Sequence, residues 1–358
     1  RFYIPDSYSV AYDVEGWRFL QTHGHDVRSW NCFPAGTWVT MADGAPRAIE
    51  LISKSDPILT GSGQEAAVSE VFQYPYRGEL TDVDAYGTPP LSLTPNHEIA
   101  VVFSQQGHDA TPEYVPAGHI SPGDYLFVPF PQWDESVSEL VTSPGRGHCR
   151  EKRIPPLVSV TPELGYVIGQ YLGDGSTTIH RGKTGVSSSL EMAYHEDERA
   201  YWEEFISCWQ STFGHRPRLT TRSELRPVRA QRVQVNGIRS VEFVRQIAGH
   251  GSATKRLDAG VMHWPVEALR RLLIGYLRAD GHTARAQYHS KYTTHRVAAT
   301  TISLDLGWQL YWIARKCGYV PSMKGRRYGR GNQVVLQFYG ADARELGPLT
   351  QRDFHPED

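Results

Sequence analysis

The sequence has few cysteines and no long apolar run. Four cysteines stand among 358 residues and none forms a CxxC pair, which argues against a disulfide framework and against a zinc site. No apolar stretch reaches the roughly 18 residues that a membrane helix needs, so a transmembrane protein is excluded. The chain begins with Arg and has no charged-then-apolar leader. We therefore expect a fragment of a cytoplasmic protein that has no membrane partner.

Charge is divided unevenly along the chain. Residues 1–150 hold 8 Lys+Arg against 19 Asp+Glu, whereas residues 151–358 hold 29 against 20. Within the basic part, residues 216–256 carry ten basic side chains and only two acidic ones, Glu224 and Glu242. Such a cluster is typical of a protein that binds a polyphosphate such as nucleic acid. A solvated basic face without a partner is the alternative.

The residue pattern changes twice along the chain. At about 100–200 residues per domain, the length predicts two or three domains. Residues 32–130 alternate short apolar and polar runs with turn signals, which predicts an all-β unit of many short strands. Residues 131–152 are polar and have few apolar anchors, as a linker does. From residue 153 onward, helical patterns alternate with pairs of strand patterns, which predicts an α+β domain.

Two similar helices divide this α+β domain into a pseudo-repeat. They read VIGQYLGDG at 167–175 and LIGYLRADG at 273–281. Each has a glycine in its middle and an aspartate just before its final glycine. The aspartates are separated by 106 residues, the length of one αββαββα unit.

The glycines and aspartates of the two helices are residue types that a helix disfavours at those positions. A mid-helix glycine costs about 1 kcal/mol relative to alanine, and close packing of two helix backbones would compensate for Gly169 and Gly275. An acid at a helix C-terminus is disfavoured by the helix dipole. If the glycine faces pack together, Asp174 and Asp280 come side by side, and a shared cation makes this tolerable. Oxygen ligands predict Mg²⁺. For one copy of the motif, the alternative is that these residues simply end a helix. Two copies at this spacing make that alternative weaker.

These paired motifs resemble those of the LAGLIDADG, or DOD-type, homing endonucleases over about 155–345. The resemblance implies two pseudo-symmetric αββαββα units whose motif helices form the interface and whose sheets form a saddle on double-stranded DNA. It implies Mg²⁺-dependent phosphodiester hydrolysis with Asp174 and Asp280 as metal ligands. Lys255 is the best match for the lysine that assists the metal-bound water, and Lys324 the second. The expected DNA contacts come from Arg216, Arg218, Arg222, Arg226, Arg229, Arg232, Lys324, Arg326 and Arg327.

The first half contains residues suited to peptide-bond chemistry. Cys32 follows Asn31, and the segment LTPNHEIAVV supplies Thr94 and His97 three residues apart. The Cys32 thiolate could attack the Asn31 carbonyl while His97 protonates the amide nitrogen, which gives an N-to-S acyl shift. A packed cysteine and a structural histidine are the alternatives.

The first half resembles the N-terminal part of an intein, a splicing domain of the Hint fold. The Cys-start segment, the Thr-Pro-Asn-His segment and the strand after SPGD occur in the family's order. The resemblance implies a multidomain chain. Residues 1–31 would end an N-extein of unknown host, residues 32–150 would be an incomplete all-β Hint domain, and residues 151–358 would be the endonuclease. Splicing would need no cofactor and would act on the host extein in cis.

The sequence departs from the intein pattern at two places. Lys54-Ser55-Asp56 replaces the family's Gly-Asp, and the chain ends in RDFHPED rather than in a His-Asn pair. We therefore expect that this chain cannot complete splicing without a missing C-terminal intein segment. Two alternatives remain open. One is a DNA-binding module that keeps the LAGLIDADG fold without cutting, and the other is a Hint autoprocessing protein that cleaves after Asn31 without ligation.

Overall fold

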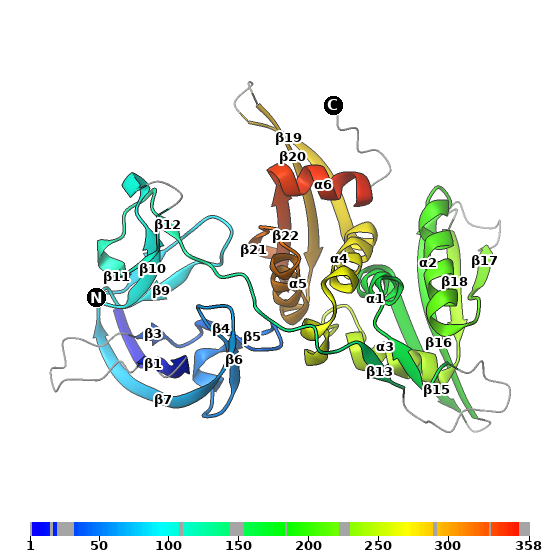
Figure 1. The fold of residues 1–358 in the computed structure, drawn as a ribbon, viewed down its shortest axis with the longest axis horizontal. Coiled ribbons are helices and arrows are strands. Elements are labelled where there is room, and N and C mark those ends of the chain that lie inside the picture. The colour runs from blue at the N-terminus through cyan, green and yellow to red at the C-terminus, as the bar shows by residue number, and fades with distance from the viewer. Residues whose placement is uncertain are drawn as a thin grey trace. The chain divides into compact units, whose positions relative to one another are not determined.

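The chain divides into two compact units in a computed structural model (Figure 1). The first comprises Arg1–Trp133 with Ser322–Lys324, and the second comprises Asp134–Pro321 with Gly325–Asp358. The structure describes residues 2–14, 17–19, 32–106, 110–142, 154–182, 185–221, 230–288, 292–328 and 331–350. In these ranges, no helix combines the length and the apolar character required to cross a membrane.

The first unit is built from antiparallel strands, and apart from β1 and β7 they are short, as the alternating pattern of residues 32–130 predicts. The strands are β1 (Phe2–Val14), β2 (Trp17–Phe19), β3 (Phe33–Pro34), β4 (Trp38–Thr40), β5 (Pro46–Ala48), β6 (Pro57–Leu59), β7 (Glu65–Gly78), β8 (Thr81–Val83), β9 (Leu91–Leu93), β10 (Glu98–Val102), β11 (Glu113–Pro116) and β12 (Tyr125–Leu126). Short 3₁₀ helices at Ile49–Leu51, Ser104–Gln106 and Ala117–His119 connect some of them. That this unit is a Hint splicing domain stays a prediction.

The largest sheet of the first unit has the order β2-β1-β7-β6, and β3 pairs with β1. Strand β1 pairs antiparallel with β7, so part of the segment that precedes Cys32 belongs to this sheet. A small core of Met41, Ile52, Ile58 and Val68 packs nearby. The assignment of residues 1–31 to an extein stays a prediction.

The second unit contains the same succession of elements twice. The first half has α1 (Pro162–Asp174), β15 (Gly175–Gly182), β16 (Gly185–His195), α2 (Arg199–Phe213), β17 (Arg218–Thr221), β18 (Ala230–Asn236) and α3 (Ile238–Ala248). The second half has α4 (Val266–Asp280), β19 (Gly281–Tyr288), β20 (Tyr292–Thr301), α5 (Leu304–Lys316), β21 (Ser322–Tyr328), β22 (Gly331–Tyr339) and α6 (Gly340–Thr350), although the first three residues of β21 group with the first unit. Both sheets have the strand order first-second-fourth-third. The predicted pair of αββαββα units is confirmed.

Three further elements of the second unit lie outside the repeat. Strand β13 (Glu139–Val141) pairs with β14 (Leu157–Ser159) before α1 begins, and the 3₁₀ helix η4 (Ala259–His263) precedes α4. The second unit thus begins inside the polar stretch 131–152. Two residues of that stretch bond to distant parts of the second unit. The Asp134 carbonyl oxygen accepts a hydrogen bond from the Lys316 ammonium at 3.0 Å, and the Val137 amide donates to the His263 carbonyl oxygen at 3.1 Å.

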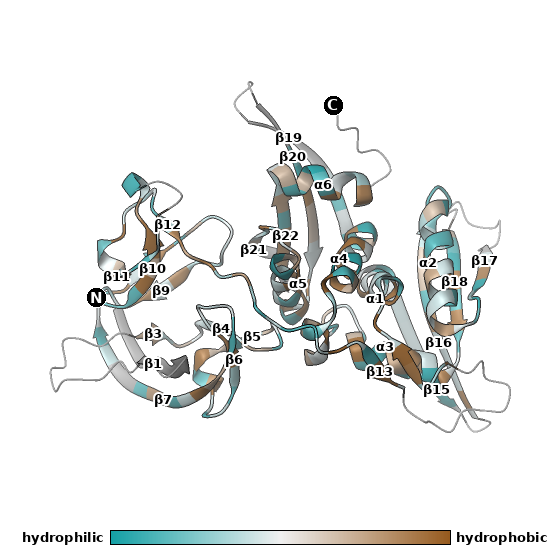
Figure 2. Cartoon of the chain, in the orientation of Figure 1, coloured by the Kyte–Doolittle hydropathy of each residue, from teal (hydrophilic) through white to brown (hydrophobic). Residues whose placement is uncertain are grey.

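Helix starts and buried faces follow from local sequence. Helix α1 begins where the Thr161 hydroxyl accepts a hydrogen bond from the Leu164 amide, with Pro162 in the first turn. Helix α2 shows hydrophilic and hydrophobic stretches side by side (Figure 2) and buries Phe205 and Trp209 four residues apart. The sheets bury Leu190 and Met192 of β16 and Leu336 and Phe338 of β22, so the core of each half lies between its helices and its sheet.

Candidate active site

Helices α1 and α4 pack with their backbones in contact. A Cβ atom added at Gly169 would lie 2.0 Å from the Leu272 carbonyl oxygen, and one added at Gly275 would lie 2.6 Å from the Tyr166 carbonyl oxygen. Neither distance leaves room for a methyl group, so only glycine allows this approach. The close packing predicted from Gly169 and Gly275 is confirmed.

Two more glycines of α1, which were not predicted to pack, extend this contact. A Cβ atom at Gly165 would lie 2.0 Å from the Ala268 carbonyl oxygen, and one at Gly173 would lie 2.3 Å from the Ala279 Cβ. The signal was present in the sequence. Glycines spaced by four residues lie on one face of a helix, and three of them occur in succession in GYVIGQYLG.

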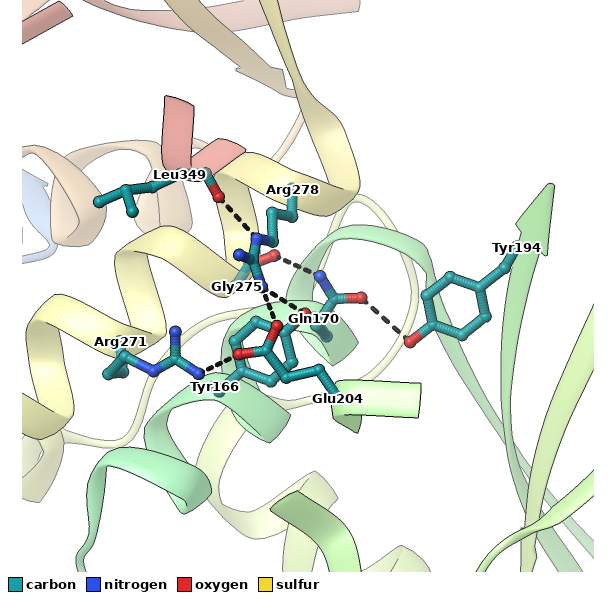
Figure 3. Close-up of polar contacts among 8 residues, drawn as sticks. All are labelled: Tyr166, Gln170, Tyr194, Glu204, Arg271, Gly275, Arg278 and Leu349. Carbon is teal, nitrogen blue, oxygen red and sulfur yellow. Dashed lines mark hydrogen bonds and ion pairs between the residues drawn. The ribbon is translucent and has the colours of Figure 1, made fainter. Parts of the chain in front are cut away.

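A buried chain of hydrogen bonds joins the two helices to the sheet β15-β16-β18-β17, called the first sheet from here on (Figure 3). The Gln170 side-chain amide of α1 donates to the Gly275 carbonyl oxygen of α4 at 3.0 Å. The Tyr194 hydroxyl of β16 donates to the Gln170 amide oxygen at 3.0 Å. Gln170 and Tyr194 are almost completely buried. Because each of these polar groups has a partner, the chain fixes how α1 lies against α4.

An ion-pair cluster joins α4 to α2 near the same interface (Figure 3). Arg271 and Arg278 of α4 both contact the Glu204 carboxylate of α2. Arg278 also donates to the Tyr166 hydroxyl at 3.1 Å and to the Leu349 carbonyl oxygen at 2.6 Å. Burial alone would raise the pKa of Glu204, but hydrogen bonds and charge from the two arginines bring that pKa below its usual value. The cluster therefore stays ionised and holds α4 to its neighbours.

The helix packing brings Asp174 and Asp280 into electrostatic contact. Asp174 is the last residue of α1 and Asp280 the last of α4. Displacement of water by the surrounding protein and, to a smaller extent, the neighbouring Asp280 carboxylate together raise the pKa of Asp174 to about 6, although the Lys255 charge counteracts them. Displacement of water likewise raises the pKa of Asp280. Both side chains are nevertheless exposed at the surface, where a large substrate could reach them.

The two carboxylates fit a divalent cation. From the described residues, no hydrogen bond or ion pair reaches either Asp174 or Asp280, so their oxygens are available as ligands. Carboxylate oxygens suit Mg²⁺ or Ca²⁺, and a cation between them would relieve the repulsion that contributes to the raised pKa of Asp174. No group of three or more His, Cys, Asp or Glu side chains gathers as a metal site in the described ranges. The roles of Asp174 and Asp280 as metal ligands and catalytic residues stay a prediction.

Lys255 lies under the same end of α1. Its ammonium donates to the main-chain carbonyl oxygens of Tyr171 at 2.7 Å, Leu172 at 2.9 Å and Gly175 at 2.8 Å. Burial lowers the pKa of Lys255 to about 8, although the aspartates counteract this. The catalytic role that the family resemblance implies for Lys255 stays a prediction, as does that of Lys324, which is exposed on β21.

The predicted DNA contacts are only partly described. Arg216 and Arg218 are exposed, and Arg232 of β18 pairs with Glu191 of β16 at 3.5 Å. The strand register places Arg218 opposite Gln234, which lies opposite Glu191, so a row of polar residues crosses the first sheet. Three of the predicted contacts lie outside the described residues: Arg222, Arg226 and Arg229. Two more, Arg326 and Arg327, lie in the part of β21 whose side chains are not described. All nine DNA contacts stay predictions.

The structure also brings together three residues predicted for peptide chemistry in the first unit. The Cys32 amide donates to the Thr94 hydroxyl at 3.0 Å, and the Thr94 amide donates to the Cys32 carbonyl oxygen at 3.0 Å. The His97 amide donates to the Thr94 carbonyl oxygen at 3.0 Å, and the His97 ring lies 4.2 Å from the Phe33 ring between centroids. Asn31 lies outside the described residues. The catalytic roles of Cys32, Thr94 and His97 stay predictions.

No family model matches the chain. Over 328 residues it is 25% identical to an iron–sulfur cluster assembly SufBD family protein of Mycobacterium tuberculosis, covering 85% of this chain and 34% of that protein. Over 327 residues it is 24% identical to the ATP-dependent DNA helicase Hel308 of Thermococcus kodakarensis, covering 82% of this chain and 28% of that protein. The chain thus spans about a third of the length of the curated relatives it matches.

Among solved structures, the chain is similar to homing endonucleases. A mesophilic variant of I-DmoI has a TM-score of 0.40 and 10% identity, covering 55% of this chain and 98% of that one. The LAGLIDADG homing endonuclease I-GzeII, in complex with its DNA target, has a TM-score of 0.36 and 12% identity, covering 53% of this chain and 83% of that one.

Proposed function

We propose that the second unit is a metal-dependent endonuclease that cuts both strands of duplex DNA at a specific site. The observation that carries this proposal is the carboxylate pair, because two exposed acids at helix C-termini have no structural use that offsets their repulsion. Asp174 and Asp280 would hold a divalent cation. That cation would activate water and stabilise the leaving oxygen of a phosphodiester.

The charge of the second half supports a DNA substrate. Residues 151–358 carry nine more basic than acidic residues. Arg218 begins strand β17 of the first sheet, Arg216 lies two residues before it, and both are exposed. Contacts of arginine with phosphates supply most of the affinity of a DNA-binding surface and place the DNA relative to the reacting groups. The polar row formed by Arg218, Gln234 and Glu191 offers donors and acceptors suited to base edges.

Cleavage of duplex DNA tests the proposal. The chain is incubated with a plasmid library that carries random inserts and with Mg²⁺, and the cut products are sequenced. We expect Asp174→Asn and Asp280→Asn each to lower the cleavage rate by about 10³-fold or more, while DNA binding in Ca²⁺ persists. Asp258→Asn is the matched control, because Asp258 is an exposed acid of the same unit that caps η4. Unchanged cleavage by Asp174→Asn would refute the proposal.

We also propose that the first unit performs an N-to-S acyl shift at the bond between Asn31 and Cys32. The mutual hydrogen bonds of Cys32 and Thr94 favour this, because they hold the residue after the scissile bond at both its amide and its carbonyl. The Cys32 sulfur would attack the Asn31 carbonyl carbon, the carbon–nitrogen bond would break, and His97 would give a proton to the leaving nitrogen. The product is a thioester, the opening step of splicing or of self-cleavage.

A thiol assay tests this second proposal. An added thiol such as dithiothreitol captures a thioester and releases the segment that precedes it. We expect mass spectrometry to find the fragment 1–31 after such treatment of the chain and to find none for Cys32→Ala. Cys208→Ala is the control, because Cys208 is also a buried thiol but lies in the second unit. Equal release by Cys32→Ala would rule the acyl shift out.

A further inference from the structure

Lys255 reaches from a loop of the second unit to the end of α1. The loop follows α3, and the Lys255 side chain is only 5% exposed. Its ammonium donates to carbonyl oxygens of the last turn of α1 and of Gly175, and the Gly173 carbonyl oxygen lies at 3.2 Å. The last carbonyls of a helix lack partners within the helix and carry its negative dipole charge. Lys255 therefore caps the C-terminus of the helix that ends in Asp174.

The main chain of Lys255 is held as firmly as its ammonium. Its amide donates to the Gly251 carbonyl oxygen at 2.9 Å, and its carbonyl oxygen accepts from the Ser303 hydroxyl at 2.6 Å. Ser303 is the N-cap residue of α5 in the second half of the unit. One residue thus connects the end of α1 with the start of α5, and little freedom is left to move the ammonium.

The hydrogen bonds of Lys255 leave no proton for the reacting atoms. An ammonium group has three protons, and the three shortest contacts, at 2.7 to 2.9 Å, go to carbonyl oxygens on both sides of Asp174 in the chain. The Lys255 charge interacts with those of Asp280 and Asp174, but in the described ranges no hydrogen bond or salt bridge joins its ammonium to either carboxylate. A general acid or base must reach the proton that it transfers.

We propose that Lys255 is a positioning residue that fixes the end of α1 and thereby holds Asp174 beside Asp280, instead of exchanging a proton with water. This inference rests on the proposed metal-dependent nuclease. A lysine that acted by charge alone would repel a divalent cation, so its removal would tighten metal binding. A lysine that positions a ligand gives the opposite sign, because its removal loosens the ligand pair.

Mn²⁺ affinity in the absence of DNA separates these roles. Titration is followed by the electron paramagnetic resonance of free Mn²⁺, below the melting temperature of every variant. We expect Lys255→Met to weaken Mn²⁺ binding by about tenfold or more. Lys316→Met is the matched control, because the Lys316 ammonium also bonds main-chain carbonyl oxygens, those of Asp134 and Met262, and we expect it to leave Mn²⁺ affinity unchanged. Unchanged or tighter binding by Lys255→Met would overturn the proposal.

A second variant covers the case in which Lys255→Met does not fold. Lys255→Arg keeps the cation but cannot give up a proton, because arginine remains protonated in proteins. We expect its DNA cleavage rate to stay within about tenfold of the parent, whereas loss of a general acid or base costs about 10²–10⁴-fold. A loss of that size by Lys255→Arg, with parental Mn²⁺ affinity, contradicts a positioning role. If Asp174→Asn and Asp280→Asn bind Mn²⁺ like the parent, the proposed nuclease fails instead.

Discussion

The two candidate sites of this molecule differ in what surrounds their reactive groups. In the second unit, Asp174 and Asp280 end two regular helices, and their carboxylates are exposed. In the first unit, Cys32 is 1% exposed and sits among short strands and turns. An exposed pair suits a large substrate that arrives from outside. An enclosed thiol suits a bond that is already part of the chain.

The sites also differ in what holds them. The carboxylate pair depends on glycine contacts and buried side-chain bonds between residues about 100 positions apart, such as Gln170 and Gly275. The Cys32 site depends on main-chain hydrogen bonds between two short segments. The first site should therefore be sensitive to side-chain volume along two helices, and the second to the few atoms that contact the scissile bond.

The largest expected effect concerns the enclosed site. His97→Ala removes the proposed proton donor, and we expect thiol-induced release of fragment 1–31 to slow by about 10²–10⁴-fold. The rate is measured by mass spectrometry over time. His119→Ala is the control, since His119 is an exposed histidine of the same unit. If both variants release the fragment at the parental rate, His97 takes no part in the reaction.

The next effect tests the backbone contact of the other site. A methyl group at Gly169 would collide with the Leu272 carbonyl oxygen, so we expect Gly169→Ala to lower the free energy of unfolding by about 3 kcal/mol or more. Urea unfolding measures this. Gly325→Ala is the control, because nothing lies within 4 Å of a Cβ added there. Similar stabilities of the two variants would show that α1 and α4 are not in backbone contact.

The pH dependence of stability tests the carboxylate pair without any metal. The pKa of Asp174 is about 6 in the folded protein and 3.8 as a reference, so the folded state binds more protons between these values. Stability should therefore fall as pH rises from about 4 to about 6 and stay lower above it. Asp174→Asn removes the carboxylate and with it the unfavourable free energy of ionising this site in the folded protein. With a chelator present, we expect its Tm to exceed the parental Tm by a few degrees at pH 7.5 and to match it near pH 4. A lower Tm for Asp174→Asn at pH 7.5 would mean that the carboxylate stabilises the fold.

The smallest expected effect concerns the surface that accompanies the exposed pair. Arg218→Ala should reduce by about one the slope of log affinity for duplex DNA against log salt concentration. Fluorescence anisotropy with a labelled duplex measures the slope. Arg199→Ala serves as the control, because Arg199 lies on α2 and pairs with Glu203. Equal slopes for both variants and the parent would show that Arg218 does not contact the DNA.

The sequence predicts the features that depend on local pattern. The glycine spacing and terminal acids of VIGQYLGDG and LIGYLRADG predict the paired helices, because helix geometry alone puts Gly169 and Asp174 where they are relative to each other. The alternation of strand and helix patterns likewise predicts both αββαββα units, since each element is marked by its own periodicity.

Features that join distant segments could not be predicted. Lys255 bonds carbonyls 80 to 84 positions earlier, and nothing in its own segment marks it as a helix cap. The polar residues from Asp134 onward look like a linker, yet the Lys316 ammonium 182 positions away binds the Asp134 carbonyl oxygen. Gln170 did carry a signal, as a polar residue within an apolar helix, but only the tertiary structure shows its partner at Gly275.

Anomalous scattering from a crystal of the chain soaked in Mn²⁺ would locate the cation that Asp174 and Asp280 are proposed to share. We expect a peak that lies about 2.0–2.4 Å from an oxygen of Asp174 and from an oxygen of Asp280, and that disappears in Asp174→Asn. A Mn²⁺ peak bound elsewhere, with none between these two carboxylates, would contradict this expectation.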